Sequence, residues 1–124
     1  ETASKTMVAF HLEARRDWGH ARDYVKAMWL MLQQGTPDDY VVASGRSVSV
    51  RDFCDLAFQR VGLKADDHIV VDERYFRASE VHFLEGNPAK AVERLGWRPE
   101  TTLEELVGEM VDAGLERVKR RECS

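Results

Sequence analysis

Residues 15–35 read RRDWGHARDYVKAMWLMLQQG, a stretch that joins an arginine-rich start to a long apolar run. Asp23 can accept hydrogen bonds from the first free backbone amides of a helix, and Gly35 suits the left-handed position just after a helix. The stretch therefore predicts a helix that begins at Asp23 and ends at Gly35. Apolar residues lie nearly all round this helix, a distribution that is typical of a buried one.

The rest of the chain predicts three more helices and a few short strands. Each further helix follows a capping signal, namely Ser49-Val50-Arg51-Asp52, Asn87-Pro88 and Thr102-Leu103-Glu104-Glu105. Short apolar runs at residues 7–12, 40–43 and 69–71 are the strand candidates. Two or three short strands of parallel type cannot cover both faces of a sheet alone. The chain is therefore expected to be a helix-rich α/β unit that forms half of a larger fold.

Composition narrows the classes of protein to which the chain can belong. A length of 124 residues suits one domain, and 44% hydrophobic with 32% charged residues is typical of a globular protein. The net charge of −4 argues against a nucleic-acid partner. The longest apolar run, residues 27–32, is too short to cross a membrane, and we expect no secretory leader. Cys54 and Cys123 favour free thiols over a disulfide, so a cytoplasmic location is expected.

Recognisable catalytic motifs are absent from the sequence. It contains no GxSxG, P-loop lysine, SxxK, GxGxxG or Tyr-x-x-x-Lys pattern. The histidines lack the spacing of metal ligands, and they are His11, His20, His68 and His82. We therefore predict no catalytic residue and no metal site in this chain.

Two arginine-containing stretches suggest anion recognition instead. Arg16 lies beside the WGH corner, and ERYFRASE at residues 73–80 places Arg77 near Glu80. The planar guanidinium can bind phosphate oxygens through two bonds, and a carboxylate accepts hydrogen bonds from paired hydroxyls such as those of a ribose. This chemistry suits a nucleotide clamp. A cluster of surface ion pairs is the alternative explanation.

Three segments together resemble the GDP-mannose 4,6-dehydratase family, in its C-terminal portion. They are ARRDWGHARDYVKAMWLMLQQ, DDYVVASGRSVSVRDF and VVDERYFRASEVHFLEGNPAKAVERLGWRPETTLEELVGEMV, within a match from Phe10 to Glu116. The resemblance implies the small helix-rich α/β C-terminal substrate domain of an extended short-chain dehydrogenase, lacking the Rossmann domain. It divides the chain into an unpatterned or poorly ordered segment at 1–9, a GDP-sugar substrate-binding domain at 10–118 and a basic tail at 119–124.

The resemblance also implies an activity for the parent protein. Members of the family are NADP-dependent lyases that convert GDP-mannose to GDP-4-keto-6-deoxymannose, a step toward sugars such as GDP-fucose. The chain alone lacks the catalytic tyrosine and lysine and the cofactor motif, so we expect it to bind no NADP and to be inactive. Its expected partners are GDP-mannose or GDP, and either further copies of itself or the missing Rossmann half.

Carried over residue by residue, the resemblance assigns three substrate-binding positions. Arg16 and Arg77 correspond to arginines that reach the nucleotide diphosphate, and Glu80 to the acidic residue that meets the ribose. Trp18 is expected to pack the corner, whereas Arg15 and Arg22 are expected to be solvated. Two alternatives remain open: a fragment of another nucleotide-sugar epimerase or reductase, and a non-catalytic interaction module that associates through the apolar helix at residues 23–35.

Overall fold

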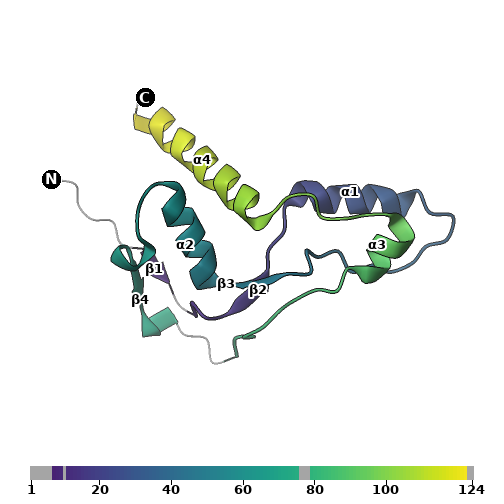
Figure 1. Ribbon diagram of the computed structural model, residues 1–124, viewed down its shortest axis with the longest axis horizontal. Helices are drawn as coiled ribbons and strands as arrows, with labels where there is room; N and C mark the ends of the chain where they lie inside the picture. The colour runs from purple at the N-terminus through teal and green to yellow at the C-terminus, as the bar shows by residue number, and fades with distance from the viewer. Residues whose placement is uncertain (1–6, 10, 76–78, 123–124) are drawn as a thin grey trace.

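The computed structural model describes residues 7–9, 11–75 and 79–122. The strands are β1 (Met7–Ala9), β2 (Arg15–Asp17), β3 (Ser47–Ser49) and β4 (Ile69–Val71). The helices are α1 (Ala21–Leu32), α2 (Val50–Arg60), α3 (Ala89–Leu95) and α4 (Leu103–Glu122), with short 3-10 turns at Ala65–Asp67 and Glu73–Tyr75. The fold is a small, helix-rich α/β unit, as predicted. α1 and α3 lie at one end, and α2 with β1 and β4 lies at the other (Figure 1).

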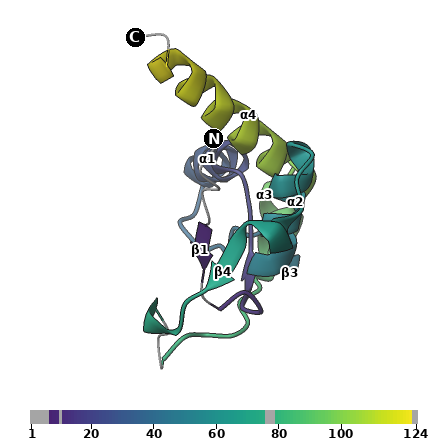
Figure 2. The ribbon, with the colours of Figure 1, turned by 90° about the vertical axis from the view of Figure 1, so that its left-hand side faces the viewer.

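The strands form two separate pairs. β1 pairs with β4 in parallel, and the two lie side by side in Figure 2. β2 pairs with β3 in antiparallel register, with Arg16 opposite Val48. The other edge of β2 is also bonded, because the Arg15 N–H donates to the His82 carbonyl at 2.8 Å and the Leu84 N–H donates to the Arg15 carbonyl at 3.0 Å. The backbone of β2 is thus held on both sides.

The strand predictions are confirmed only in part. β4 occupies residues 69–71 as expected, and β1 covers the first half of the predicted run at 7–12. β1 also lies within the segment 1–9, which was expected to be unpatterned or poorly ordered. Its pairing with β4 was not predicted, because the two strands are far apart in the sequence. The prediction of a strand at 40–43 is wrong, since no described backbone group pairs with these residues. The sequence analysis missed β2 and β3 altogether.

The predicted caps at Ser49 and Thr102 are confirmed, but those of the other two helices are not. The cap of α3 is Pro88 rather than Asn87. α1 runs from Ala21 to Leu32, and Gly35 is not in the left-handed conformation predicted for it. The Ser49 hydroxyl accepts from the Asp52 N–H at 3.0 Å. The Thr102 hydroxyl accepts from the Glu105 N–H at 3.2 Å, while the Glu105 carboxylate accepts from the Thr102 N–H at 2.8 Å. Gly96 follows α3 in the left-handed conformation with a φ of 63°. Each cap joins residues that are close in sequence, which explains why the pattern alone predicts it.

Two clusters of buried side chains form the core. The first joins α1 to α3 and consists of Ala27, Ala91, Leu95 and Trp97. The second joins β3 to α4 and consists of Val48, Leu103 and Val107, with side chains of α2 packed against it. Cys54 on α2 is a buried free thiol. Since only the first half of α4 reaches the core, Met110 and Val118 further along this helix are more than half exposed.

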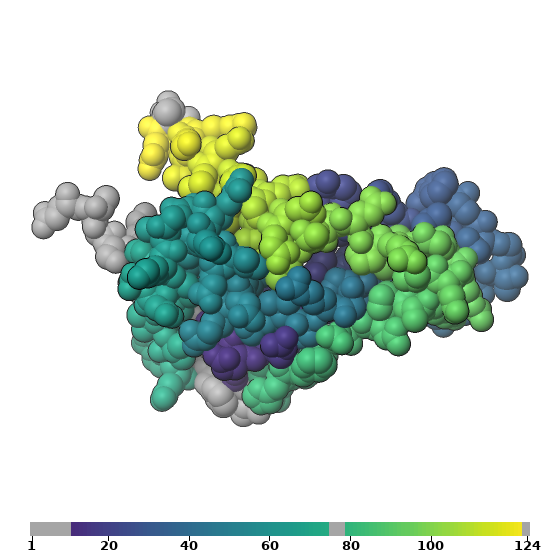
Figure 3. All heavy atoms as spheres, viewed as in Figure 1, coloured from purple at the N-terminus to yellow at the C-terminus, as the bar shows by residue number. Residues whose placement is uncertain are grey.

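The apolar pattern of α1 predicts a buried helix, but α1 is largely exposed. Only Asp23 and Ala27 are buried in this helix. One face carries large apolar side chains that are all more than half exposed, namely Val25, Met28, Trp29 and Leu32. In Figure 3 this helix lies at the outer edge of the molecule, in blue. The pattern shows that α1 can be buried, but α3 and the segment after it cover only one side.

Residues 119–122, which belong to the predicted basic tail at 119–124, form the basic end of α4. This helix projects away from the rest of the molecule (Figure 1). In the described part of the chain, no helix combines the length and the apolar character that a membrane span requires.

Candidate functional site

The structure brings together two of the three predicted site residues. Arg16 on β2 and Glu80, which are 64 residues apart in the sequence, form an ion pair between a guanidinium nitrogen and a carboxylate oxygen. Both side chains are largely shielded, with exposed fractions of 23% and 20%. A second guanidinium nitrogen of Arg16 donates to the Arg15 carbonyl at 2.8 Å. Arg77 lies outside the described residues.

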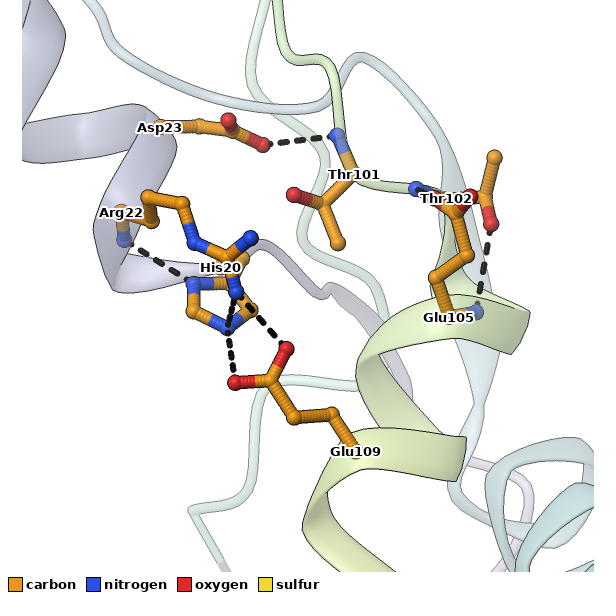
Figure 4. Close-up of polar contacts among 7 residues, drawn as sticks. All are labelled: His20, Arg22, Asp23, Thr101, Thr102, Glu105 and Glu109. Atoms are coloured by element: carbon orange, nitrogen blue, oxygen red, sulfur yellow. Dashed lines mark hydrogen bonds and ion pairs between the residues drawn. The ribbon is translucent and has the colours of Figure 1, made fainter.

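The other two arginines of the opening stretch are both exposed, as expected. The Arg15 guanidinium nevertheless donates to the Ser47 carbonyl at 2.6 Å. It does so because β3 runs next to β2, which the sequence does not reveal. Arg22 is exposed, as expected, and pairs with Glu109 of α4 at 2.7 Å (Figure 4). His20 lies 3.4 Å from the same carboxylate, and His20 and Arg22 together hold the pKa of Glu109 below its ordinary value.

Asp17 organises the backbone next to Arg16, a role that sequence reasoning missed. Its carboxylate accepts from the N–H groups of Ser44 at 2.8 Å and Gly45 at 2.9 Å, and from the Gly86 N–H at 3.2 Å. It thereby ties β2 to two segments that are distant in the sequence. A side chain at Gly86 would place its Cβ only 2.3 Å from the Cβ of Ala43, so this close approach requires glycine. Gly45 and Gly86 were the only hint in the sequence that backbone segments approach closely here, but nothing in the sequence links them to Asp17.

Trp18 packs the corner after β2, as predicted. Its ring lies against Phe53 with 4.5 Å between centroids, and its indole N–H donates to the Val48 carbonyl at 3.2 Å. A cavity beside it is lined by Trp18, Ser44, Arg46, Val48 and residues 99–103. Arg16 and Glu80 are not among these lining residues, so the predicted site and this cavity are separate features.

Asp23 does not cap α1, which corrects the prediction. The cap is His20, whose ring Nδ1 accepts from the Arg22 N–H at 2.9 Å. Asp23 is buried and its Oδ2 accepts from the backbone N–H groups of Thr101 at 2.9 Å and Glu100 at 3.2 Å (Figure 4). Its carboxylate faces the segment before α4 because that segment packs against the start of α1. Among the described residues, no group of three acidic, histidine or cysteine side chains could hold a metal ion.

Comparison with solved structures defines the class of this domain. UDP-glucose 4-epimerase from Thermotoga maritima, solved with UDP-glucose, superposes with a TM-score of 0.82 at 25% identity, over 93% of this chain and 36% of that one. RMD from Pseudomonas aeruginosa, complexed with NADPH, superposes with a TM-score of 0.77 at 22% identity, over 90% and 36%. The fold is that of the smaller, helix-rich domain of an extended short-chain dehydrogenase.

Sequence comparison identifies the family within that class. The family described as GDP-mannose 4,6 dehydratase matches residues 1–110. GDP-mannose 4,6 dehydratase 1 from Arabidopsis thaliana is 54% identical over 110 residues, which cover 89% of this chain and 30% of that protein. The chain therefore belongs to the GDP-mannose 4,6-dehydratase family, and it spans about a third of the length of the relatives it matches.

Proposed function

We propose that this chain is the substrate-binding portion of a GDP-mannose 4,6-dehydratase, which converts GDP-mannose to GDP-4-keto-6-deoxymannose. Family membership supports the reaction. The observation that carries the binding role is the convergence of Arg16 and Glu80, from distant parts of the sequence, in one shielded pair. This pair also differs from the chain's exposed ion pairs in its shielding and in lying on a strand that is bonded on both edges.

Each proposed binding residue has a role that suits its chemistry. Arg16 would bind oxygens of the GDP diphosphate through its planar fork. Glu80 would accept hydrogen bonds from the ribose hydroxyls, since a carboxylate is an acceptor only. Arg77, outside the described residues, would be the second arginine at the diphosphate. GDP-mannose and GDP are accordingly the proposed ligands.

The proposed parent reaction uses NADP, and the described residues do not fit that cofactor. A dinucleotide site needs a glycine-rich turn between a strand and a helix, but here β3 passes directly from Ser49 into α2 at Val50. When NADP is bound in a whole enzyme of this kind, it accepts and returns a hydride. This chain contributes binding and orientation of the nucleotide, so alone it should form no 4-keto-6-deoxy product.

Replacing Arg16 with alanine is expected to weaken GDP binding by a factor of about 10 to 100, which corresponds to the loss of a charge-assisted contact. Isothermal titration of GDP and then GDP-mannose into the chain measures this change directly. Arg22→Ala is the matched control, because Arg22 belongs to the same stretch but pairs with Glu109 on α4. GDP binding that is equally strong with and without Arg16 would contradict the proposed site.

The exposed apolar face of α1 favours a second function, as an interaction surface. Its large side chains, Val25, Met28, Trp29 and Leu32, lie on one helix, and exposed contiguous apolar patches commonly mark association sites. We propose that this surface packs against the part of the parent protein that this chain does not cover. In the isolated chain, the same surface would drive self-association.

Trp29→Lys is expected to abolish concentration-dependent self-association of the isolated chain, because a charge at the centre of the apolar face opposes its burial. Light scattering across a range of protein concentrations would show the unaltered chain growing in mean mass and the variant staying monomeric. Leu63→Lys is the control, since Leu63 is also exposed but lies beyond α2. A monomeric unaltered chain at all concentrations would refute the interaction surface.

A further inference from the structure

Arg16 and Glu80 neutralise each other in the chain without ligand. Among the described residues, theirs is the only ion pair in which both side chains are less than a quarter exposed. The arginine pairs at the surface are much more open, with exposed fractions of 53% and 52% for Arg60 and Asp112. Charges shielded from water attract each other more strongly, and either charge is costly to leave alone. Arg16 is therefore already occupied before any anion arrives.

An incoming phosphate must compete with the Glu80 carboxylate. Both groups are anionic acceptors that seek the same guanidinium N–H donors, and they repel each other when they are close. We propose that Glu80 is an exchangeable counter-ion: it occupies Arg16 in the free chain, and a nucleotide diphosphate displaces it. This proposal rests on the proposed function, because it takes the diphosphate as the group that replaces Glu80.

The fold allows this exchange without moving the strand. β2 holds the backbone of Arg16 between β3 and the segment at 82–84. Arg16 also keeps its bond to the Arg15 carbonyl, which does not involve Glu80. Glu80 lies outside any helix or strand, two residues before the segment that bonds to β2. Rotation of the Glu80 side chain is therefore sufficient to release Arg16.

The exchange makes Glu80 a residue that determines specificity. Against a bare diphosphate, Glu80 only competes, because such an ion has no ribose hydroxyl for the freed carboxylate to bind. Against a nucleotide, the displaced carboxylate finds hydroxyl donors nearby and its charge is again solvated by hydrogen bonds. Glu80 thus selects nucleotides over free pyrophosphate by penalising the wrong ligand as well as by binding the right one.

The test is a titration of pyrophosphate and of GDP into the unaltered chain and into Glu80→Gln. We expect Glu80→Gln to bind pyrophosphate about tenfold more tightly, and the preference for GDP over pyrophosphate to fall by at least about the same factor. Arg16→Ala added to Glu80→Gln should remove the gain. Glu80→Asp, which keeps the charge but shortens its reach, should give a smaller gain and serves if Glu80→Gln folds poorly.

Asp112→Asn is the matched control, because it removes one negative charge from an exposed arginine pair on α2 and α4. A gain of equal size in this control, or a gain that survives Arg16→Ala, would overturn the exchange in favour of a net-charge effect. Unchanged or weaker pyrophosphate binding by Glu80→Gln would also overturn it, even if the unaltered chain binds GDP and the proposed function stands. Conversely, an Arg16-dependent gain in a chain that binds no GDP would support the exchange and refute the nucleotide-sugar role.

Discussion

Replacing Trp97 with alanine is expected to lower the free energy of unfolding by about 4 kcal/mol, the cost of removing a large buried aromatic side chain. Trp97 is only 2% exposed and packs with Ala27, Ala91 and Leu95 between α1 and α3. Its indole N–H also donates to the Asp23 carbonyl at 2.8 Å. The loss is large because α1 has little other cover in this chain. Urea denaturation followed by circular dichroism measures it.

Two further variants separate packing from hydrogen bonding at this position. Trp97→Phe keeps most of the ring volume and loses the bond to Asp23, so about half the effect or less is expected. Trp29→Ala makes the same change as Trp97→Ala at a tryptophan that is 61% exposed, and little destabilisation should follow. Equal losses at Trp29 and Trp97 would show that α1 and α3 do not pack as described.

Asp23→Ala is expected to cost about 3 kcal/mol of stability, because it leaves two backbone N–H groups without their acceptor. Both of these groups, from Glu100 and Thr101, donate to the same oxygen, Oδ2. The single side-chain oxygen of asparagine can keep both bonds, so Asp23→Asn should lose roughly half as much, through the missing charge. Asp55→Ala, at an exposed position of α2, is the control in the same denaturation experiment. An Asp23→Ala variant as stable as this control would contradict the role of Asp23.

The stability that Asp23 contributes should also depend on pH. Burial raises the pKa of Asp23, but the N–H groups of Thr101 and Glu100 and the charge of Lys26 lower it by more, so it lies below its ordinary value of 3.8. A lowered pKa in the folded state means that the contribution is complete above the unfolded-state pKa and is lost as pH falls through the folded one. The difference in unfolding free energy between the unaltered chain and Asp23→Asn should therefore shrink below about pH 4. A difference that is constant from pH 7 to pH 3 would be evidence against an ionised Asp23.

The role of Asp23 shows where local pattern and tertiary structure diverge. An aspartate ahead of an apolar run suits a helix cap, and the sequence analysis assigned it accordingly. In the structure its partners lie 77 and 78 residues further on, and His20 takes the cap. Both arrangements satisfy the chemistry of the same carboxylate. The choice between them depends on how closely the segment before α4 packs against α1, which no local pattern contains.

The candidate site shows the same division. The family resemblance assigned Arg16 and Glu80 to one ligand, and the structure places them in contact with each other. The resemblance could not show that Arg16 and Glu80 neutralise each other without ligand, because that depends on the path of the segment after Glu80 along β2. The supporting bonds of Asp17 were missed for the same reason, since its partners at Ser44, Gly45 and Gly86 are remote in sequence.

The sequence by itself determined the helices, their caps at Ser49 and Thr102, and the family to which the chain belongs. These features arise from residues a few positions apart, or from motifs read in order, so they need no knowledge of the fold. Only the tertiary structure decided which strands pair, which face of α1 is left exposed, and which group Asp23 and Arg16 each bind. Those outcomes depend on contacts between distant segments, where several partners satisfy the same side chain and packing selects one of them.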